Sequence, residues 1–414
     1  MDFLTLHNGL RIVLYPVDHA PLTAVNLWFG VGSKDEKPGK TGFAHLFEHL
    51  MFEGSRNVPH HEHFIRLEEV VAAANGSTWS DHTIYYETFS PKHLELALFL
   101  ESDRMGYLLD ALAQEKLDGQ RAVVKNERRW RVDNRPYGIW DERLFELAFP
   151  AGHPYHHPII GYMEDLDRAT LGDVEDFFRA YYVPSNAVLT VAGSFNRAKA
   201  LSLIRRYFDP IPAGMPPRSV VPVFPEPADA PVESVITDHV ALPRLYMMFQ
   251  APARGTDGCV DAEAVPHLLG EGRGSLLYRE LVLKRRIASS TSASLMPAMG
   301  VSALVATVTG MPSSRVEDLK AAAFECLDGL RDDGIPAQDA RRARTCALSD
   351  GLLQWESLTQ KATLLSEAVM TSGDPEEALR HAEKLERISP ERLDPLVKEL
   401  LGRPPVLLGF VGRS

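Results

Sequence analysis

A proline-dense stretch near the middle of the chain sets the strongest limit on how it can fold. Residues 209–231 read DPIPAGMPPRSVVPVFPEPADAP. Proline fixes φ and donates no backbone hydrogen bond, so this stretch can continue neither a helix nor a central strand. We therefore interpret 209–231 as an extended linker between domains at 1–208 and 232–414. A chain of 414 residues also favours two or more domains on size alone.

The two predicted domains share a pattern of strands. LRIVLYP (10–16), LTAVNLWFGVG (22–32) and YYVPSNAVLTVAGSF (181–195) are typical of buried strands before the linker. After it, PRLYMMFQAP (243–252) repeats the pattern of 22–32 and leads into a helix-like segment. This restart indicates an internal duplication. The second copy has a lone His267, which we interpret as a structural or solvated histidine.

Composition removes several classes of function. A formal net charge of −12 argues against a nucleic-acid partner, which favours a basic surface. Three widely separated cysteines exclude a disulfide framework and a cysteine zinc cluster. No run of about 18 apolar residues occurs, so we expect no membrane span. The N-terminus lacks a signal-peptide pattern, so we expect a cytoplasmic protein, or a periplasmic one if a leader was removed.

The sequence His45-Leu-Phe-Glu48-His49 carries the clearest chemistry. Two imidazoles four residues apart share one face of a helix and can hold one metal ion, with the glutamate beside it. This is the inverted form of the zinc-protease motif H-E-x-x-H. The apolar residues of FAHLFEHLM fall on the opposite side of a helical wheel and would face the core. The alternative is a solvated helix face with two incidental histidines.

A catalytic zinc needs a third protein ligand, and Glu127 is the best candidate. On the predicted helix GQRAVVKNERRWR, Glu127 shares a face with Gln120, Val123 and Val124. A carboxylate on an apolar face is costly unless it is paired or bound to a metal. Position alone does not distinguish metal ligation from a salt bridge to an arginine.

Two further groups of histidines lack the helical spacing of metal ligands. They are His60, His61 and His63 in a polar loop, and His153, His156 and His157 among prolines. We interpret both groups as surface or substrate-adjacent residues. No nucleophile elbow, phosphate-binding loop or dinucleotide fingerprint supports a rival chemistry.

Longer segments extend the signal of the motif. The first two are HNGLRIVLYP and VGSKDEKPGKTGFAHLFEHLMFEGS. Others are NGSTWSDHTIYYE (75–87), QRAVVKNERR (120–129), HPYHHPIIGYMEDL (153–166), YYVPSNAVLTVAGSF (181–195) and GEGRGSLLYRELV (270–282). Together they resemble the M16, or pitrilysin-type, zinc peptidases, especially the short bacterial members and the mitochondrial processing peptidase β subunit. The resemblance therefore covers nearly the whole chain.

The resemblance implies an α+β fold of two homologous α/β-sandwich halves, each a mostly antiparallel sheet with packed helices. It implies one Zn²⁺ per chain, held by His45, His49 and Glu127, with Glu48 as the general base. Asn75 would contact the substrate backbone. The expected function is an endopeptidase for peptides or unfolded segments, enclosed in a chamber that excludes folded proteins. The alternatives are a non-catalytic scaffold subunit of the same fold and a dedicated leader- or precursor-peptide processing protease.

The chain departs from the family in two places. Many relatives carry a glutamate seven residues before the third ligand, where this chain has Gln120, whose amide can still hydrogen-bond a histidine ligand. In a family segment L-R-x-x-x-G-L-A-Y, this chain has Val282 for the arginine and Ser289 for the tyrosine. Arg285 or Arg286 could substitute, although both are offset along the segment. We therefore predict a zinc-bearing subunit whose related partner supplies the arginine and tyrosine.

Overall fold

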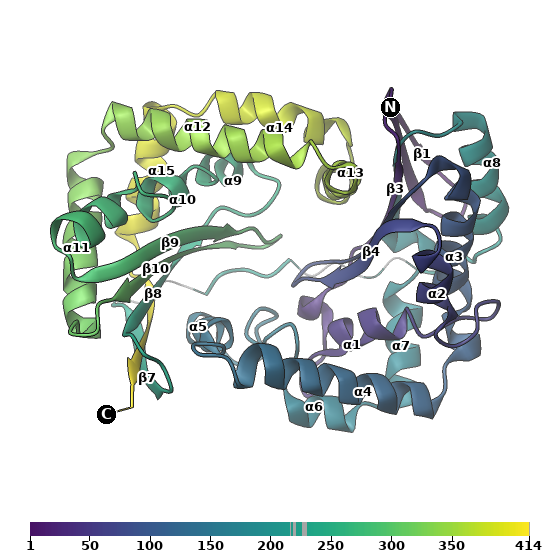
Figure 1. Ribbon diagram of the computed structural model, residues 1–414, viewed down its shortest axis with the longest axis horizontal. Helices are drawn as coiled ribbons and strands as arrows, with labels where there is room; N and C mark the ends of the chain where they lie inside the picture. Colours follow the sequence, from purple (N-terminus) through teal and green to yellow (C-terminus); the bar gives the residue numbers. More distant parts are fainter. Residues whose placement is uncertain (216, 218–220, 226–229, 414) are drawn as a thin grey trace. The chain divides into compact units, whose positions relative to one another are not determined.

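The protein is an α+β structure with two mixed sheets, each packed with helices, as the resemblance implied (Figure 1). The computed structural model describes residues 1–215, 217, 221–225 and 230–413. The described part of 209–231 contains no helix or strand, and residues 216, 218–220 and 226–229 lie outside it. The boundaries 1–208 and 232–414 remain a prediction.

Backbone contacts divide the chain into two compact units, each made of separate segments. The first comprises Met1–Arg128, His157–Val220 and Leu353–Leu379, and the second comprises Arg129–His156, Val221–Leu352 and Arg380–Ser414. Each unit therefore contains one segment from the other side of the proline-dense stretch. Each exchanged segment contains a helix that packs on the sheet of the unit it joins.

The first unit is built on a six-stranded sheet in the order β1-β2-β6-β3-β5-β4. Its strands are β1 (Asp2–Thr5), β2 (Arg11–Pro16), β3 (Thr23–Phe29), β4 (Val71–Thr78), β5 (Thr83–Phe89) and β6 (Ala187–Gly193). β2 and β6 are parallel, and the other neighbours are antiparallel. The three strands predicted before the linker are confirmed as β2, β3 and β6, with shorter ends.

Both faces of this sheet are covered by helices. They are α1 (Phe43–Leu50), α2 (Glu62–Glu68), α3 (Leu94–Tyr107), α4 (Gln114–Arg128), α6 (Met163–Arg168), α7 (Leu171–Tyr181), α8 (Arg197–Phe208) and α13 (Leu358–Ser372). Every residue of β3 and β6 is buried. Strand residues alternate between faces, so a strand covered on both sides reads as a continuous apolar run. This explains why 22–32 and 181–195 show no polar alternation.

Helix α13 covers one face of the first sheet, although it lies far beyond the linker. Val13, Trp28 and Val188 of the sheet pack with Leu365 and Val369 of the helix. Polar residues on the same face of the sheet form hydrogen bonds with α13. Asn26 Nδ2 donates to Thr363 Oγ1 at 3.2 Å, and the hydroxyls of Thr190 and Ser366 lie 2.8 Å apart. α13 is thus an integral part of the first unit.

The second unit is built on a five-stranded sheet in the order β7-β11-β8-β10-β9. Its strands are β7 (Val232–Asp238), β8 (Arg244–Ala251), β9 (Ala288–Met296), β10 (Ser302–Gly310) and β11 (Val406–Gly412). β7 and β11 are parallel and the other neighbours are antiparallel. This repeats the arrangement β2-β6-β3-β5-β4 and supports the predicted internal duplication. The strand predicted at 243–252 is confirmed as β8.

The helices of the second unit also include one from across the linker. They are α5 (Trp140–Ala148), α9 (Asp257–Ala262), α10 (Val265–Leu269), α11 (Val316–Asp333) and α15 (Pro390–Gly402), while α12 (Ala337–Gln354) and α14 (Glu376–Glu386) cross the unit boundaries. Short 3-10 or π turns occupy Ser33–Asp35, Pro91–His93, Leu108–Ala111, Arg129–Asp133, Pro184–Asn186 and Tyr278–Lys284. Leu144 of α5 packs with Tyr246 and Phe410 on one face of this sheet. Across the described residues, no helix is both long and apolar enough to cross a membrane.

We predict that Leu365→Ala destabilises the first unit through α13. Leu365 is fully buried against the sheet, and a buried leucine truncated to alanine costs about 2–5 kcal/mol of unfolding free energy. Gln360→Ala on the exposed side of the same helix is the control and should change stability by less than about 0.5 kcal/mol. Denaturant unfolding measures both. Equal stability of the two variants would contradict the packing of α13 on this sheet.

Candidate metal centre

Helix α1, which carries the His45–His49 motif, is fixed at its N-terminus by a buried carboxylate. Its N-cap residue, Gly42, has φ +82° and no side chain to cap the helix. Glu36 replaces such a cap, because its two oxygens accept from the backbone N–H groups of Gly42 at 2.8 Å and Ala44 at 2.7 Å. Burial raises the pKa of Glu36 well above its usual value, and these two hydrogen bonds oppose that rise.

The apolar side chains of α1 face the core, and its two histidines and Glu48 lie on the opposite side, as the helical wheel predicted. The apolar stripe is fully buried and consists of Phe43, Leu46, Phe47, Leu50 and the adjoining Met51. On the other side, the side chains of His45 and His49 are only 13% and 23% exposed, and Glu48 is buried. Such limited exposure contradicts the alternative of a solvated face with incidental histidines.

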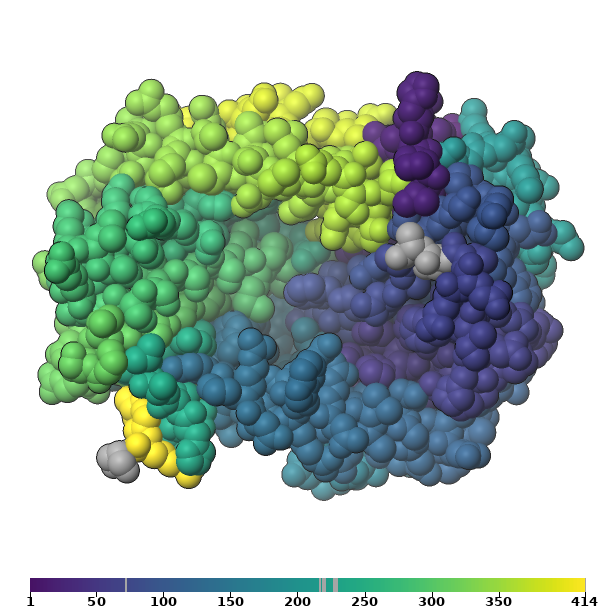
Figure 2. Space-filling model, viewed as in Figure 1, coloured from purple at the N-terminus to yellow at the C-terminus, as the bar shows by residue number. Residues whose placement is uncertain are grey.

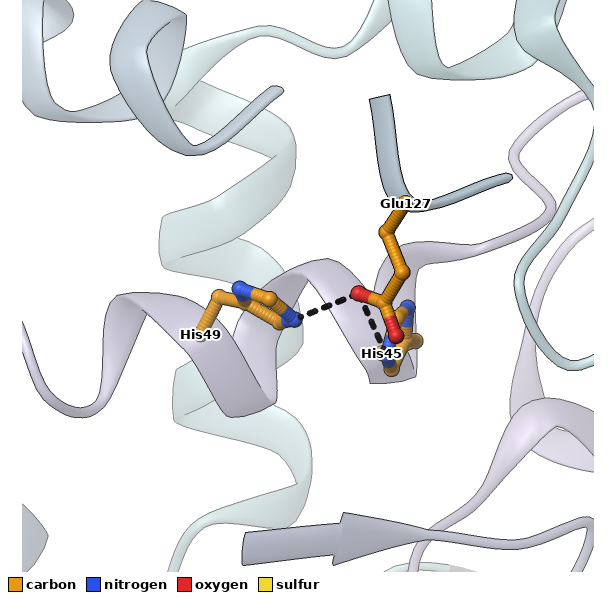
Figure 3. A group of neighbouring side chains, drawn as sticks. All are labelled: His45, His49 and Glu127. Atoms are coloured by element: carbon orange, nitrogen blue, oxygen red, sulfur yellow. Dashed lines mark ion pairs between the residues drawn. The ribbon is translucent and has the colours of Figure 1, made fainter. Parts of the chain in front are cut away.

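Glu127 of α4 points at both histidines of the motif (Figure 3). Its Oε2 lies 3.3 Å from Nε2 of His49 and 3.7 Å from Nε2 of His45. The two imidazole rings stand edge to face, with centroids 4.9 Å apart. Of the two valines predicted to share a helix face with Glu127, Val124 is buried whereas Val123 is 46% exposed. The segment with α4 reaches the visible surface in Figure 2.

The three side chains fit a zinc ion of the catalytic type. Their ligand atoms all lie within 4.8 Å of one another. Zinc bonds of about 2.0–2.2 Å to nitrogen and oxygen in a tetrahedron place ligand atoms about 3.4 Å apart. The His49–Glu127 separation matches this value, and the His45–Glu127 separation exceeds it by a few tenths of an ångström. Three protein ligands leave one position for water or substrate.

The electrostatics of His49 match a metal ligand. Burial lowers its pKa, but the hydrogen bond to Glu127 and the charges of Glu127 and Glu48 raise it more, so the net pKa is raised. The same negative charges that favour a proton on His49 favour a divalent cation. Binding a metal there therefore displaces a proton, and acid competes with the metal.

Gln120 orients His49 from the side away from Glu127. Its Oε1 lies 3.3 Å from Nδ1 of His49, and its Nε2 donates to Oε1 of Glu53 at 2.7 Å. When Nδ1 of His49 donates to this amide oxygen, Nε2 keeps its lone pair for a metal. The structure thus brings Gln120 to the position at which the resemblance expected it.

Strand β4 holds Glu48 beside the histidines. Thr78 Oγ1 donates to Oε2 of Glu48 at 2.5 Å. A Cβ atom on Gly76 would lie 2.9 Å from Oε1 and Cγ of Glu48, so a larger residue there would displace the Glu48 side chain. Asn75 is exposed next to Gly76, and its Oδ1 accepts from the Gly76 N–H at 2.9 Å. β4 is an edge strand of the first sheet.

Sequence reasoning missed several residues of this site. Glu36 had a weak signal, since acidic residues favour helix N-termini. Thr78, Gly76 and Glu53 had none, because they act through contacts with side chains far away in the sequence or on another element. Only the fold brings Thr78 and Gly76 to α1 and Glu53 to Gln120.

The other histidines lie outside the three-residue group, and one prediction about them was wrong. His63 is 1% exposed and packs edge-on against Phe52, so it is a core residue and not a surface residue. Burial lowers its pKa well below the usual value. His267 lies 3.1 Å from Asp350 with its side chain 13% exposed, which makes it structural.

The second histidine group is held by local contacts. His153 Nε2 lies 2.9 Å from the Val223 carbonyl oxygen, and His156 Nδ1 lies 2.7 Å from that of Phe149. His157 Nδ1 lies 3.5 Å from Oε2 of Glu36. His157 therefore supports the carboxylate that caps α1.

Residues 281–289, where the chain departs from the family, also form contacts within their own unit. Ser289 Oγ lies 3.2 Å from the carbonyl oxygens of Thr309 and Gly310. Arg285 Nη1 donates to Glu325 Oε2 at 2.8 Å. These contacts tie the serine and the nearby arginine to their own unit.

Sequence profiles of two M16 domains match this chain. The profile described as insulinase, peptidase family M16, matches residues 12–153, and the M16 inactive-domain profile matches 168–345. A zinc protease named PqqE from Helicobacter pylori is 31% identical over 369 residues, which cover 88% of this chain and 82% of that protein. A mitochondrial-processing peptidase subunit beta of Lentinula edodes is 25% identical over 52% of this chain and 46% of its own length.

A solved structure of similar sequence has the same fold. The crystal structure of a protease from Helicobacter pylori superposes with a TM-score of 0.89 at 29% identity and covers 98% of both chains. The fold of this chain is therefore found in a known protease.

We predict that Glu127→Gln removes tightly bound zinc. The amide keeps the shape of the side chain but loses the charge that binds the cation, so affinity should fall by at least about tenfold. Zinc content is measured by elemental analysis after dialysis against a nanomolar zinc buffer. Glu115→Gln, on the exposed side of α4, is the control and should keep one zinc per chain. A Glu127→Gln protein with unchanged zinc would remove Glu127 from the ligand set.

Proposed function

The chain belongs to the M16 peptidase family, and we propose that it is a zinc-dependent endopeptidase for peptides or unfolded polypeptide segments. The convergence of His45, His49 and Glu127, with Glu48 buried beside them, carries this proposal. A non-catalytic scaffold of the same fold would need neither the three ligands nor the buried glutamate. The family relationship also supports a zinc protease.

Each of the named side chains has a separate task in peptide hydrolysis. Zinc held by His45, His49 and Glu127 would supply a Lewis acid and would lower the pKa of a bound water molecule. Glu48 accepts a proton from the attacking water and delivers it to the nitrogen of the leaving amine. The Thr78 hydroxyl holds Oε2 of Glu48, which fixes the rotation of the carboxylate. The backbone at Gly76 limits where Oε1 can move.

Edge strand β4 is the proposed substrate-binding element. An extended peptide can pair with the free edge of a sheet through main-chain hydrogen bonds, which gives affinity with little sequence preference. β4 pairs with β5 on its inner side and forms the end of the sheet. A peptide along its outer side would pass Gly76 and therefore Glu48. The exposed amide of Asn75 is placed to contact the backbone of that peptide.

We also propose that full activity requires a related subunit. The family's arginine and tyrosine are thought to hold substrate and stabilise the oxyanion, and this chain has Val282 and Ser289 in their places. Arg285, the nearest substitute, is engaged by Glu325. The similarity to a protein named as a subunit of the mitochondrial processing peptidase supports a two-subunit enzyme. A partner without the H-x-x-E-H motif would supply the missing pair.

The same similarity favours a second candidate, a dedicated protease for leader or precursor peptides. It would use the same metal, base and edge strand. Profiling cleavage across a random peptide pool separates the two, since a dedicated enzyme cuts a narrow set of sequences.

We predict that Glu48→Gln abolishes turnover and keeps zinc. The amide cannot accept the water proton, so the rate of peptide hydrolysis should fall by about 10²–10⁴-fold. Glu68→Gln, at an exposed position on α2, is the control and should keep both activity and zinc. Hydrolysis of a quenched fluorescent peptide and zinc content are measured on the same samples. Unchanged turnover in Glu48→Gln would exclude Glu48 as the base.

We predict that the isolated chain is weakly active and that a related subunit activates it. The partner is an M16-like protein that lacks H-x-x-E-H and carries the arginine–tyrosine segment. Peptidase assays compare the chain alone, the partner alone and an equimolar mixture. A partner with its arginine changed to alanine is the control and should not activate. Full activity of the isolated chain would contradict the division of labour.

A further inference from the structure

A second group of metal-binding side chains lies near the first, and Glu53 is its centre. Glu53 is 8% exposed and lies shortly after α1. Its Oε2 is 3.2 Å from Nδ1 of His60 and 3.9 Å from Nδ1 of His61. One ligand atom from each residue lies within 4.8 Å of the others. Helical spacing does not link His60 and His61 to Glu53, so the sequence alone does not group these three residues.

The geometry of the two histidines suits a shared cation. Both Nδ1 atoms lie near one carboxylate oxygen, and the ring centroids lie 3.6 Å apart. Without a metal, each neutral ring can donate its Nδ1–H to Glu53. A metal ion would replace these protons and bind the lone pairs of both rings together with the carboxylate oxygen.

The carboxylate of Glu53 is held in the orientation that such a site needs. Its Oε1 accepts from Nε2 of Gln120 at 2.7 Å, which turns Oε2 toward the histidines. Buried polar support of a ligand is typical of metal sites. Lys116 interacts electrostatically with Glu53, and this positive charge weakens the attraction for a cation. The side chains of His60 and His61 are 41% and 68% exposed, so the group is accessible from solvent.

We propose that Glu53, His60 and His61 form a second divalent-metal site, weaker than the first and filled after it. Two imidazole nitrogens and one carboxylate oxygen suit Zn²⁺ and Co²⁺, whereas Ca²⁺ and Mg²⁺ prefer oxygen ligands alone. Gln120 joins the two sites, since it contacts His49 with one end of its amide and Glu53 with the other. A metal at the second site would bind the same Glu53 carboxylate that accepts the hydrogen bond from Gln120.

The test is a titration of the metal-free full chain with ZnCl₂ by calorimetry, repeated with CoCl₂ by visible absorption. Wild type should bind two equivalents, one tight and one weaker. His60→Asn/His61→Asn should weaken the second event by at least about tenfold and leave the first unchanged. Asparagine suits position 61, because His61 has φ +65° and asparagine tolerates this conformation. Circular dichroism checks that the fold is retained.

Two further variants separate this proposal from the zinc-peptidase proposal. His45→Ala should lose the tight event and keep the weaker one. His239→Asn, at an exposed histidine in the second unit, should keep both events. A single equivalent in wild type would overturn the second site. So would a weaker event that survives in His60→Asn/His61→Asn, or one that His239→Asn also removes.

Discussion

Burial of both faces of the first sheet is the constraint on which this structure depends. β3 and β6 have no exposed face, so each side of the sheet requires its own helical cover. One side receives α13, and the other receives the group that includes α1. Because α1 is needed for the core, its apolar stripe is fixed against the sheet. The opposite side of the same helix is then held rigidly enough to present metal ligands.

The candidate metal site thus depends on core packing. His45 and His49 are positioned by Leu46, Phe47 and Leu50, which are buried on the opposite side of the same helix. The proposed third ligand, Glu127, comes from α4, and the proposed base, Glu48, accepts a hydrogen bond from β4. These contacts hold the ligand atoms of the three candidate residues within 4.8 Å of one another. Side chains fixed in this way by packing and hydrogen bonds form a preorganised site.

Much of this could be predicted from the sequence, because the decisive patterns are local. The H-x-x-E-H spacing places two proposed ligands and the proposed base on one helical turn, and apolar runs identify β2, β3, β6 and β8. Glu127 could not be assigned by position alone, since a metal ligand and a salt-bridge partner both occur as a carboxylate on an apolar helix face. The family resemblance favoured ligation, and the geometry agrees.

The features that escaped prediction depend on contacts between distant segments. An amphipathic pattern shows that α13 has an apolar face but not which sheet that face will cover. His63 was wrongly placed at the surface because its neighbours in sequence are polar, whereas its neighbour in space is Phe52. Glu53 was missed because its partners come from two other segments, α4 and the residues just before α2.

The late position of α13 in the chain has a consequence for biosynthesis. The strands that it covers are complete once β6 has been made, but α13 begins 165 residues later, at Leu358 after Gly193. At about 5–20 residues per second, the interval is on the order of ten seconds or more. During that time Trp28, Val13 and Val188 have no cover from α13. The nascent chain therefore presents an apolar sheet face to solvent until α13 has been made.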